Sequence, residues 1–161
     1  YKTVQRLKCT YCQEPISLRA AQGAPIEHIV PKSQYIEFMF EPKNLCVICP
    51  DCNEYKGKNE VMFQPVIKGK RRVRYPSVSS AFQIFHPHFD DYKTHIIKAN
   101  RVYVDLTPKG HYTIGICKLN RFFHYFGACD EFINDAELIE ANDLFFSTGT
   151  INTDITIQPT E

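Results

Sequence analysis

The chain has 161 residues, of which 43% are hydrophobic, and its formal net charge is +1. This size and composition predict one globular unit that can bury a core. No run approaches the roughly 18 apolar residues of a membrane span, and the polar, basic residues 1–8 predict no signal peptide.

The charge is unevenly distributed along the chain. Up to Arg74, 13 Lys and Arg oppose seven Asp and Glu, which gives +6; from Tyr75 onward six oppose eleven, which gives −5. Attraction to a phosphate backbone is therefore expected of the first half. From Tyr125 to the end there are eight acids and no base, which suits a solvated end or a basic partner protein.

The first half is predicted to contain two short strands followed by a helix. These three elements are residues 26–30, 45–48 and 52–60. Pro31 stops the first strand, and the last segment has good helix formers without a breaker until Gly57. A short helical turn is expected at residues 16–21. Residues 32–43 are expected to be irregular and anchored by apolar side chains.

The second half is predicted to contain a hairpin and helices. Residues 101–106 and 112–116 alternate between apolar and polar side chains, as strands do. Between them, Thr107-Pro-Lys-Gly110 has Pro in its second position and Gly in its fourth, which favours a type I turn. Residues 119–126 suggest a buried helix, and residues 130–145 an acidic one.

Seven cysteines are an odd number, which fits a disulfide framework poorly. Two Cys-x-x-Cys pairs fit Zn²⁺ in a reducing cytoplasm better, because paired cysteines supply the four soft ligands of a tetrahedral site. The predicted ligands are Cys9, Cys12, Cys49 and Cys52. Cys46 and Cys49 form a further Cys-x-x-Cys, so Cys46 is an alternative ligand. We favour Cys52 because it directly precedes Asn53. Cys117 and Cys129 are expected to be core thiols.

A second group of polar residues lies between and beside the cysteine pairs: Glu27, His28, Asn44 and Asn53. Histidine titrates near neutral pH and can take a proton from water. Carboxylate and amide oxygens suit a hard cation such as Mg²⁺, which can polarise a phosphate and hold a leaving oxygen. These residue types therefore suit metal-assisted hydrolysis of a phosphodiester.

The segments Glu27-His28-Ile-Val-Pro, Asn44-Leu45 and Cys49-x-x-Cys52-Asn53-x-x-Lys56-Gly57 closely resemble the HNH endonuclease family with its ββα-metal motif, in particular the branch with a zinc knuckle. The resemblance covers about a third of the chain. It implies that His28 is the general base and that Glu27 and Asn53 hold Mg²⁺ or Mn²⁺. It also implies that Asn44 fixes the loop that orients the histidine.

Two positions depart from the family pattern. The family most often has Asp before the histidine, whereas Glu27 is one methylene longer. Asn53 stands where some members have His, which favours Mg²⁺ or Mn²⁺ over Zn²⁺ at the catalytic position. Neighbours on a flat strand point to opposite faces, so Glu27 and His28 need local twist to reach one centre. Pro31 is consistent with a strand end, where such twist is easier.

Basic side chains near this motif are predicted to contact the phosphate backbone of DNA. Lys56 lies three residues after Asn53, so on a helix both can face one phosphate; a solvated helix face is the alternative for Lys56. The basic run 68–74 either follows the backbone or is simply solvated. The predicted contacts are Lys56, Lys58, Lys70, Arg71, Arg72 and Arg74.

Histidines and acids gather at residues 86–95: His86, His88, Asp90, Asp91 and His95. Their spacing lacks a defined coordination template. We therefore expect a buried hydrogen-bonded network, or one that supports the active site, rather than a second metal site.

Thr107-Pro-Lys-Gly110, Thr113-Ile114 and Leu119-Asn-Arg121 resemble a C-terminal extension of many HNH proteins. Together with the 86–95 segment, they are similar to HNH proteins of bacterial antiphage operons, such as those of Septu and some retron systems. This resemblance implies a bacterial cytoplasmic protein that acts on duplex DNA beside an ATPase partner.

The sequence as a whole predicts an α+β fold. Residues 1–75 would form the HNH core stapled by a four-cysteine zinc site, and residues 76–161 a β-hairpin and helical extension that packs on the core and could bind a partner. The predicted function is a metal-dependent DNA endonuclease. The alternative is a non-catalytic zinc-ribbon nucleic-acid-binding or scaffold subunit, which needs the cysteines but not Glu27, His28 and Asn53.

Overall fold

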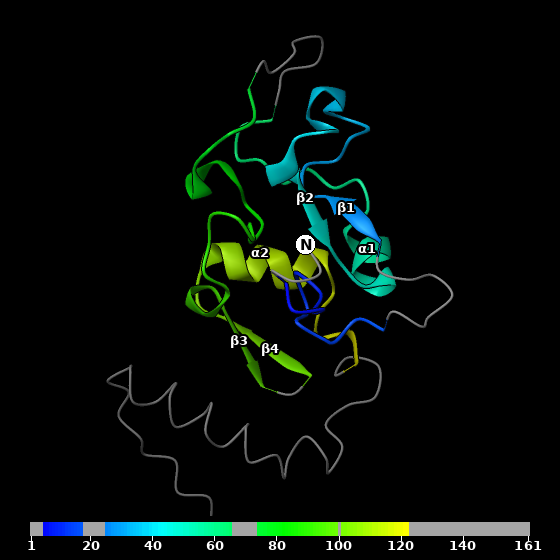
Figure 1. Ribbon diagram of the computed structural model, residues 1–161. Helices are drawn as coiled ribbons and strands as arrows, with labels where there is room; N and C mark the ends of the chain where they lie inside the picture. Colours follow the sequence, from blue (N-terminus) through cyan, green and yellow to red (C-terminus); the bar gives the residue numbers. More distant parts are fainter. Residues whose placement is uncertain (1–4, 18–24, 66–73, 100, 123–161) are drawn as a thin grey trace, which may run out of the picture.

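The computed structural model describes residues 5–17, 25–65, 74–99 and 101–122. Over these residues the chain forms short strands and two α-helices, joined by loops and 3-10 turns (Figure 1). The elements are β1 (Ile26–His28), β2 (Leu45–Val47), α1 (Pro50–Lys56), β3 (Ile96–Ala99), β4 (Val102–Asp105) and α2 (Pro108–Ile116). No helix in this described part is long and apolar enough to cross a membrane.

The predicted order of strand, strand and helix is confirmed in the first half. β1 pairs antiparallel with β2, so that Glu27 lies opposite Cys46 and His28 lies opposite Leu45. α1 follows directly, with Pro50 in its first turn and the Cys49 thiol accepting a hydrogen bond from the backbone of Cys52. The helix ends where Gly57 adopts a φ of 50°, a conformation that favours glycine.

The hairpin predicted from residues 101–106 and 112–116 does not form. The first of these segments contains β4, but β4 pairs antiparallel with β3, which precedes it, and residues 112–116 lie in α2. The cause is local: the Thr107 hydroxyl accepts a hydrogen bond from the Gly110 backbone at 3.2 Å, and Pro108 occupies the first helical turn. Thr107-Pro-Lys-Gly110 is therefore a helix N-terminus rather than a type I turn.

Gly110 sits where α2 touches the start of the hairpin. A Cβ atom at this position would lie 1.9 Å from the backbone oxygen of His95, so only glycine allows the approach. The same His95 oxygen accepts a hydrogen bond from the backbone of Leu106. This contact fixes α2 against the β3–β4 hairpin.

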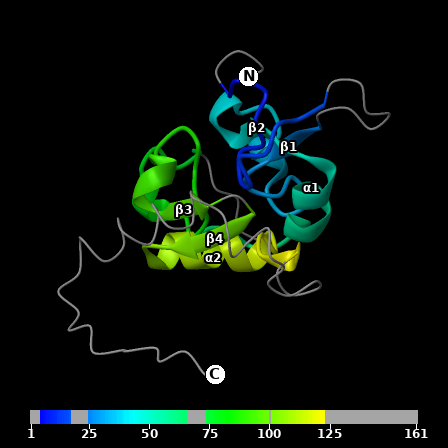
Figure 2. The same cartoon turned by 90° about the horizontal axis from the view of Figure 1, so that it is seen from below.

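One hydrophobic core joins the two halves of the chain. Figure 2 shows the hairpin and α2 beside the unit formed by β1, β2 and α1. Tyrosine hydroxyls cross between these parts: Tyr92 donates to the backbone oxygen of Tyr11 at 2.8 Å, Tyr103 donates to that of Cys12 at 2.6 Å, and Tyr112 donates to that of Glu60. The extension therefore packs directly on the loop that carries the first cysteine pair.

Between β1 and β2, the segment expected to be irregular forms two 3-10 turns, Ile36–Phe38 and Pro42–Asn44. Tyr35 and Phe38 are buried anchors, as predicted, whereas Phe40 is 82% exposed. The predicted helical turn at 16–21 lies largely outside the described residues, and the acidic helix at 130–145 lies wholly outside them. Of the helix predicted at 119–126, residues 119–122 are described, and residues 121 and 122 are helical.

Candidate functional site

The structure brings the four predicted cysteine ligands together. The sulfur atoms of Cys9, Cys12, Cys49 and Cys52 all lie within 4.8 Å of one another. The Cys12 and Cys49 sulfurs are 3.8 Å apart, and a tetrahedron with Zn–S bonds of about 2.3 Å has edges of about 3.8 Å. The cluster is therefore compatible with a zinc site.

The chemistry of these thiols also suits a metal. Hydrogen bonds from the Cys12 and Cys52 thiols lower the pKa of Cys49 below its ordinary value, which favours a thiolate in the cluster. Cys46, the alternative ligand, lies outside the cluster. Burial raises the pKa of Cys46 to about 12, so it remains a neutral core thiol.

The cysteine cluster is tied to the strand pair through Val47, the last residue of β2. The Thr10 backbone and hydroxyl both donate to the Val47 oxygen, at 3.1 and 2.9 Å. The side-chain amide of Gln5 donates to the Val47 oxygen and accepts a hydrogen bond from the Val47 nitrogen. Because Cys49 also caps α1, the cluster holds the end of β2 and the start of α1 in one frame.

Glu27 extends from β1 toward α1. Its Oε1 atom accepts a hydrogen bond from the Lys56 ammonium group at 2.7 Å. The same ammonium group donates to the backbone oxygen of His28 at 2.9 Å. Asn53 lies one turn before Lys56 on the same face of the helix and is partly exposed. The carboxylate and the amide thus lie on the two elements that meet here.

Lys56 itself is fully buried. This position does not fit the predicted phosphate contact, since its ammonium group has no exposed surface and is engaged by Glu27 and His28. Lys58 and Arg74, by contrast, are exposed. The other predicted contacts, Lys70, Arg71 and Arg72, lie outside the described residues.

His28 reaches a different neighbour from Glu27. Its Nε2 atom lies 3.0 Å from the backbone oxygen of Met39, in the loop between β1 and β2. A carbonyl oxygen can only accept, so the proton of the neutral ring lies on Nε2. Nδ1 is then the basic nitrogen, and the half-buried ring can take a proton there from a water molecule.

Asn44 is buried and spans the loop that carries Met39. Its Oδ1 atom accepts from the Val30 backbone at 2.7 Å. Its Nδ2 group donates to the backbone oxygens of Val30 and Phe38, at 3.1 and 3.0 Å. One side chain therefore satisfies three buried backbone groups and links the end of β1 to the loop that faces His28.

The histidine-rich segment forms a hydrogen-bonded network. The buried His86 ring packs against Phe82 and Phe89, which also contact each other, and its Nε2 atom is 2.9 Å from the Tyr75 hydroxyl. Burial lowers the pKa of His86 to about 3, so this ring is neutral at pH 7. Apart from the four cysteines, no group of three or more His, Cys, Asp or Glu in the described ranges could hold a metal.

Asp90 joins this network to α2. Its carboxylate accepts from the Lys109 ammonium group at 2.9 Å and from the His86 backbone at 2.7 Å. His95 bonds the Thr107 hydroxyl at 2.7 Å, and Asp91 caps the 3-10 turn Tyr92–Thr94. Sequence reasoning missed Lys109, although a lysine between Pro and Gly at a helix start is a visible signal.

His88 carries the network to the strand pair. Its Nε2 atom lies 3.1 Å from the backbone oxygen of Leu45, the residue opposite His28. The carbonyl accepts, so the imidazole donates. The 86–95 segment thus contacts the strand pair directly, at the outer edge of β2. Neither this contact nor the Met39 carbonyl leaves a sequence signal, because both use backbone atoms.

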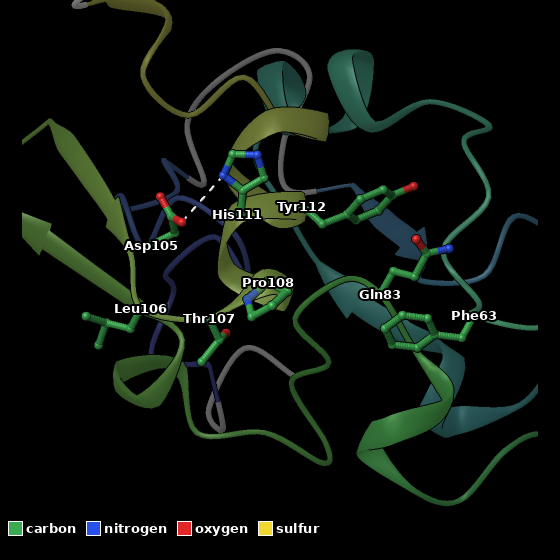
Figure 3. Close-up of a pocket in the computed structure, with 8 residues that line it drawn as sticks. All are labelled: Phe63, Gln83, Asp105, Leu106, Thr107, Pro108, His111 and Tyr112. Atoms are coloured by element: carbon green, nitrogen blue, oxygen red, sulfur yellow. Dashed lines mark ion pairs between the residues drawn. The ribbon is translucent and has the colours of Figure 1, made fainter.

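An open groove lies elsewhere, beside the start of α2 (Figure 3). It is lined by Phe63, Gln83, Asp105, Leu106, Thr107, Pro108, His111 and Tyr112. Its one ion pair joins His111 to Asp105 at 3.4 Å. The groove contains none of the predicted site residues, so we place the candidate site at β1, β2 and α1.

Comparison with known proteins agrees with this placement. Residues 9–59 match the family model described as HNH endonuclease. The segment begins at the first cysteine of the cluster and ends just after α1, and it therefore includes both the four clustered cysteines and the polar residues of β1, β2 and α1. No curated protein and no solved structure matched the chain.

Proposed function

We propose that this chain, whose residues 9–59 match an HNH-type nuclease domain, is a metal-dependent endonuclease that hydrolyses phosphodiester bonds of DNA. The observation that carries the proposal is the state of His28 within that segment. Its Nε2 atom is held by the Met39 carbonyl, which leaves Nδ1 basic. A histidine in this state can activate water for attack on a phosphate.

In this proposal the four cysteines bind a structural Zn²⁺ and take no part in the chemistry. They hold α1 and β2 in place, because Cys49 caps the helix and the loop at Thr10 bonds the strand. Asn44 fixes the loop whose Met39 carbonyl orients the histidine. In this proposal, the residues that hold the site in place are thus different from those that take part in the reaction.

Glu27 and Asn53 would hold the catalytic cation. Glu27 offers its Oε2 atom, since Oε1 is engaged by Lys56, and the side chain is 17% exposed. Carboxylate and amide oxygens suit Mg²⁺ or Mn²⁺. When bound, such a cation neutralises phosphate charge and stabilises the leaving oxygen. Lys58 and Arg74 would contact the DNA backbone, together with Lys70, Arg71 and Arg72.

The broader setting is also a proposal. The chain would act in the bacterial cytoplasm as the nuclease subunit of an antiphage complex, with an ATPase as a possible partner. Its support is the resemblance of the extension to such proteins and the eight acids without a base from Tyr125 onward. A reducing compartment would also keep the clustered cysteines available for zinc.

The non-catalytic alternative draws on one observation. The Lys56 ammonium group donates to one oxygen of Glu27. In a scaffold subunit this ion pair would serve only to stabilise the fold. Such a subunit would keep the zinc frame and bind nucleic acid without cutting it.

The deciding experiment is cleavage of supercoiled and linear plasmid DNA by the purified protein with Mg²⁺ or Mn²⁺, and without metal. We expect His28→Ala to abolish cleavage and to leave zinc content and thermal unfolding unchanged. His111→Ala is the matched control, since this histidine is exposed and lies in the groove of Figure 3. Equal cutting by wild type and His28→Ala would refute the mechanism, and wild type without nuclease activity would favour the scaffold.

A further inference from the structure

Lys56 is a charged side chain with no exposed surface. Burying an ammonium group is costly unless it is paired and hydrogen-bonded. Here the group has two recorded acceptors, the Glu27 carboxylate at 2.7 Å and the His28 backbone oxygen at 2.9 Å. These acceptors belong to the two adjacent residues that supply the carboxylate and the imidazole of the site.

The two bonds constrain the site in complementary ways. A glutamate has one more rotatable bond than an aspartate, so its carboxylate is harder to place. The hydrogen bond from Lys56 fixes one oxygen of Glu27. The hydrogen bond to the His28 carbonyl fixes the backbone of the residue that carries the imidazole. Lys56 also stands one turn after Asn53 on α1, so the same contact sets the distance between strand and helix.

We propose that Lys56 is a positioning residue of the nuclease site, whose buried ammonium group holds the Glu27 carboxylate and the His28 main chain where α1 presents Asn53. The inference rests on the proposed function, because it takes Glu27 and Asn53 as ligands of the catalytic cation. It replaces the interpretation of Lys56 as a contact to DNA.

Lys56 has two opposite effects on cation binding, and their balance decides whether its removal weakens or strengthens that binding. Its positive charge repels a divalent cation that shares Glu27, which would weaken binding. Its hydrogen bond orients the carboxylate, which strengthens binding, and loss of such an outer partner commonly costs about 10- to 100-fold in metal affinity. We expect orientation to prevail, because the ammonium group also donates to the His28 carbonyl and its bond to Glu27 is to Oε1, in a side chain that remains 17% exposed.

The test compares Lys56→Met with Lys58→Met in zinc-loaded protein. Methionine keeps the length of the buried chain and removes its charge, whereas Lys58 is exposed two residues further on. Mn²⁺ binding is measured without DNA by electron paramagnetic resonance. DNA binding is measured without catalytic metal by fluorescence anisotropy over a range of salt concentrations. Zinc content and thermal unfolding are recorded for each variant.

We expect Lys56→Met to weaken Mn²⁺ binding by about tenfold or more and to leave DNA affinity and its salt dependence unchanged. Its cleavage should recover as the Mn²⁺ concentration is raised, unlike that of His28→Ala. Lys58→Met should show the reverse, with normal Mn²⁺ binding and a salt slope that is lower by about one. Lys56→Arg retains the charge but displaces the carboxylate, so this variant should also bind Mn²⁺ weakly. It provides the test if Lys56→Met does not fold.

Two results would overturn the inference. Unchanged or tighter Mn²⁺ binding in both Lys56 variants would show that the ammonium group does not position Glu27. A reduced salt slope for DNA in Lys56→Met would restore the phosphate contact. Failure of the proposed function gives a different result: wild type would bind Mn²⁺ through Glu27 but cut no DNA. Wild type that binds no Mn²⁺ would contradict both.

Discussion

The Nζ atom of Lys56 lies 2.7 Å from the Oε1 atom of Glu27, and this ion pair joins β1 to α1 inside the protein. Its two ends differ in exposure, since the lysine side chain is fully buried and the glutamate side chain is 17% exposed. Glu27→Ala should therefore destabilise the fold by about 3–5 kcal/mol, because it leaves a buried ammonium group without its counter-charge.

Denaturant unfolding of a double-mutant cycle measures this effect. Lys56→Met should cost less than Glu27→Ala, since the remaining carboxylate can reach water, and the double variant should recover part of the loss. Asp51→Ala is the matched control. It removes the exposed pair with Arg121 and should cost less than about 1 kcal/mol. Equal losses for Glu27→Ala and Asp51→Ala would show that the buried pair does not stabilise the fold.

Asn44→Ala should reduce both stability and cleavage. The change leaves the backbone N–H and C=O groups of Val30 without their partner. It also removes one of the two hydrogen bonds that the Phe38 oxygen accepts, the other being from the Glu41 backbone. An unpaired buried group costs about 1–3 kcal/mol, so we expect a loss of about 2 kcal/mol or more in unfolding free energy. Cleavage should fall because the Met39 carbonyl no longer holds His28 in place, while zinc content stays at the wild-type level.

Asn44→Asp separates the roles of the two ends of this side chain. Aspartate keeps the acceptor for the Val30 backbone but replaces the amide donor with an oxygen that faces two carbonyls. It should therefore be as destabilising as alanine. A stable Asn44→Asp variant with full cleavage would contradict the importance of the two donated bonds.

The parts of the molecule that the sequence predicted well depend on local spacing. The strand, strand and helix order follows from short apolar runs ended by Pro31 and Gly57, and the cysteine cluster follows from two Cys-x-x-Cys pairs. The preference for Cys52 over Cys46 agrees with the cluster, because Cys46 faces the core from β2. Each of these features is determined by a few residues that lie close together in the sequence.

The errors have both local and tertiary causes. Residues 112–116 alternate like a strand, yet the Thr107 cap and the contact of Gly110 with His95 place them in a helix. The predicted phosphate contact of Lys56, like its alternative as a solvated cation, is wrong because neither the burial of this lysine nor its pairing with Glu27, 29 residues away, can be inferred from helix spacing. The contacts of His28 and His88 use backbone carbonyls, which carry no sequence signal.

His86 should make the fold sensitive to acid. Its pKa is about 3 in the folded protein, because burial disfavours the charged ring, against 6.5 ordinarily. Between these values the unfolded chain binds more protons, so stability is complete above pH 6.5 and falls as the pH is lowered. The loss should be about 1.4 kcal/mol per pH unit. His86→Gln should flatten this slope between pH 6.5 and 4.5 in denaturant unfolding.

Proton NMR of the His86 ring provides an independent check. Its resonances should stay at the neutral position down to pH 4.5, since the ring is fully buried against Phe82 and Phe89 and bonded to Tyr75. Titration of this ring near pH 6.5, or an unaltered slope in His86→Gln, would show that its burial does not govern acid stability.

Removing the metal proposed for the cysteine cluster should unfold the part of the chain that carries the site. The cluster connects the Cys9–Cys12 loop to the first turn of α1, and Cys49 also caps that helix. Metal binding and folding are therefore expected to be coupled. Cys49→Ser should lose zinc by elemental analysis, lose helical circular dichroism and lose cleavage, and a strong chelator should have the same effect on wild type.

Cys46→Ser is the control: residue 46 lies outside the cluster, so this variant should keep its zinc with only a modest loss of stability. Wild-type protein that contains no zinc after purification, or a Cys49→Ser variant with full zinc content, would contradict the assignment.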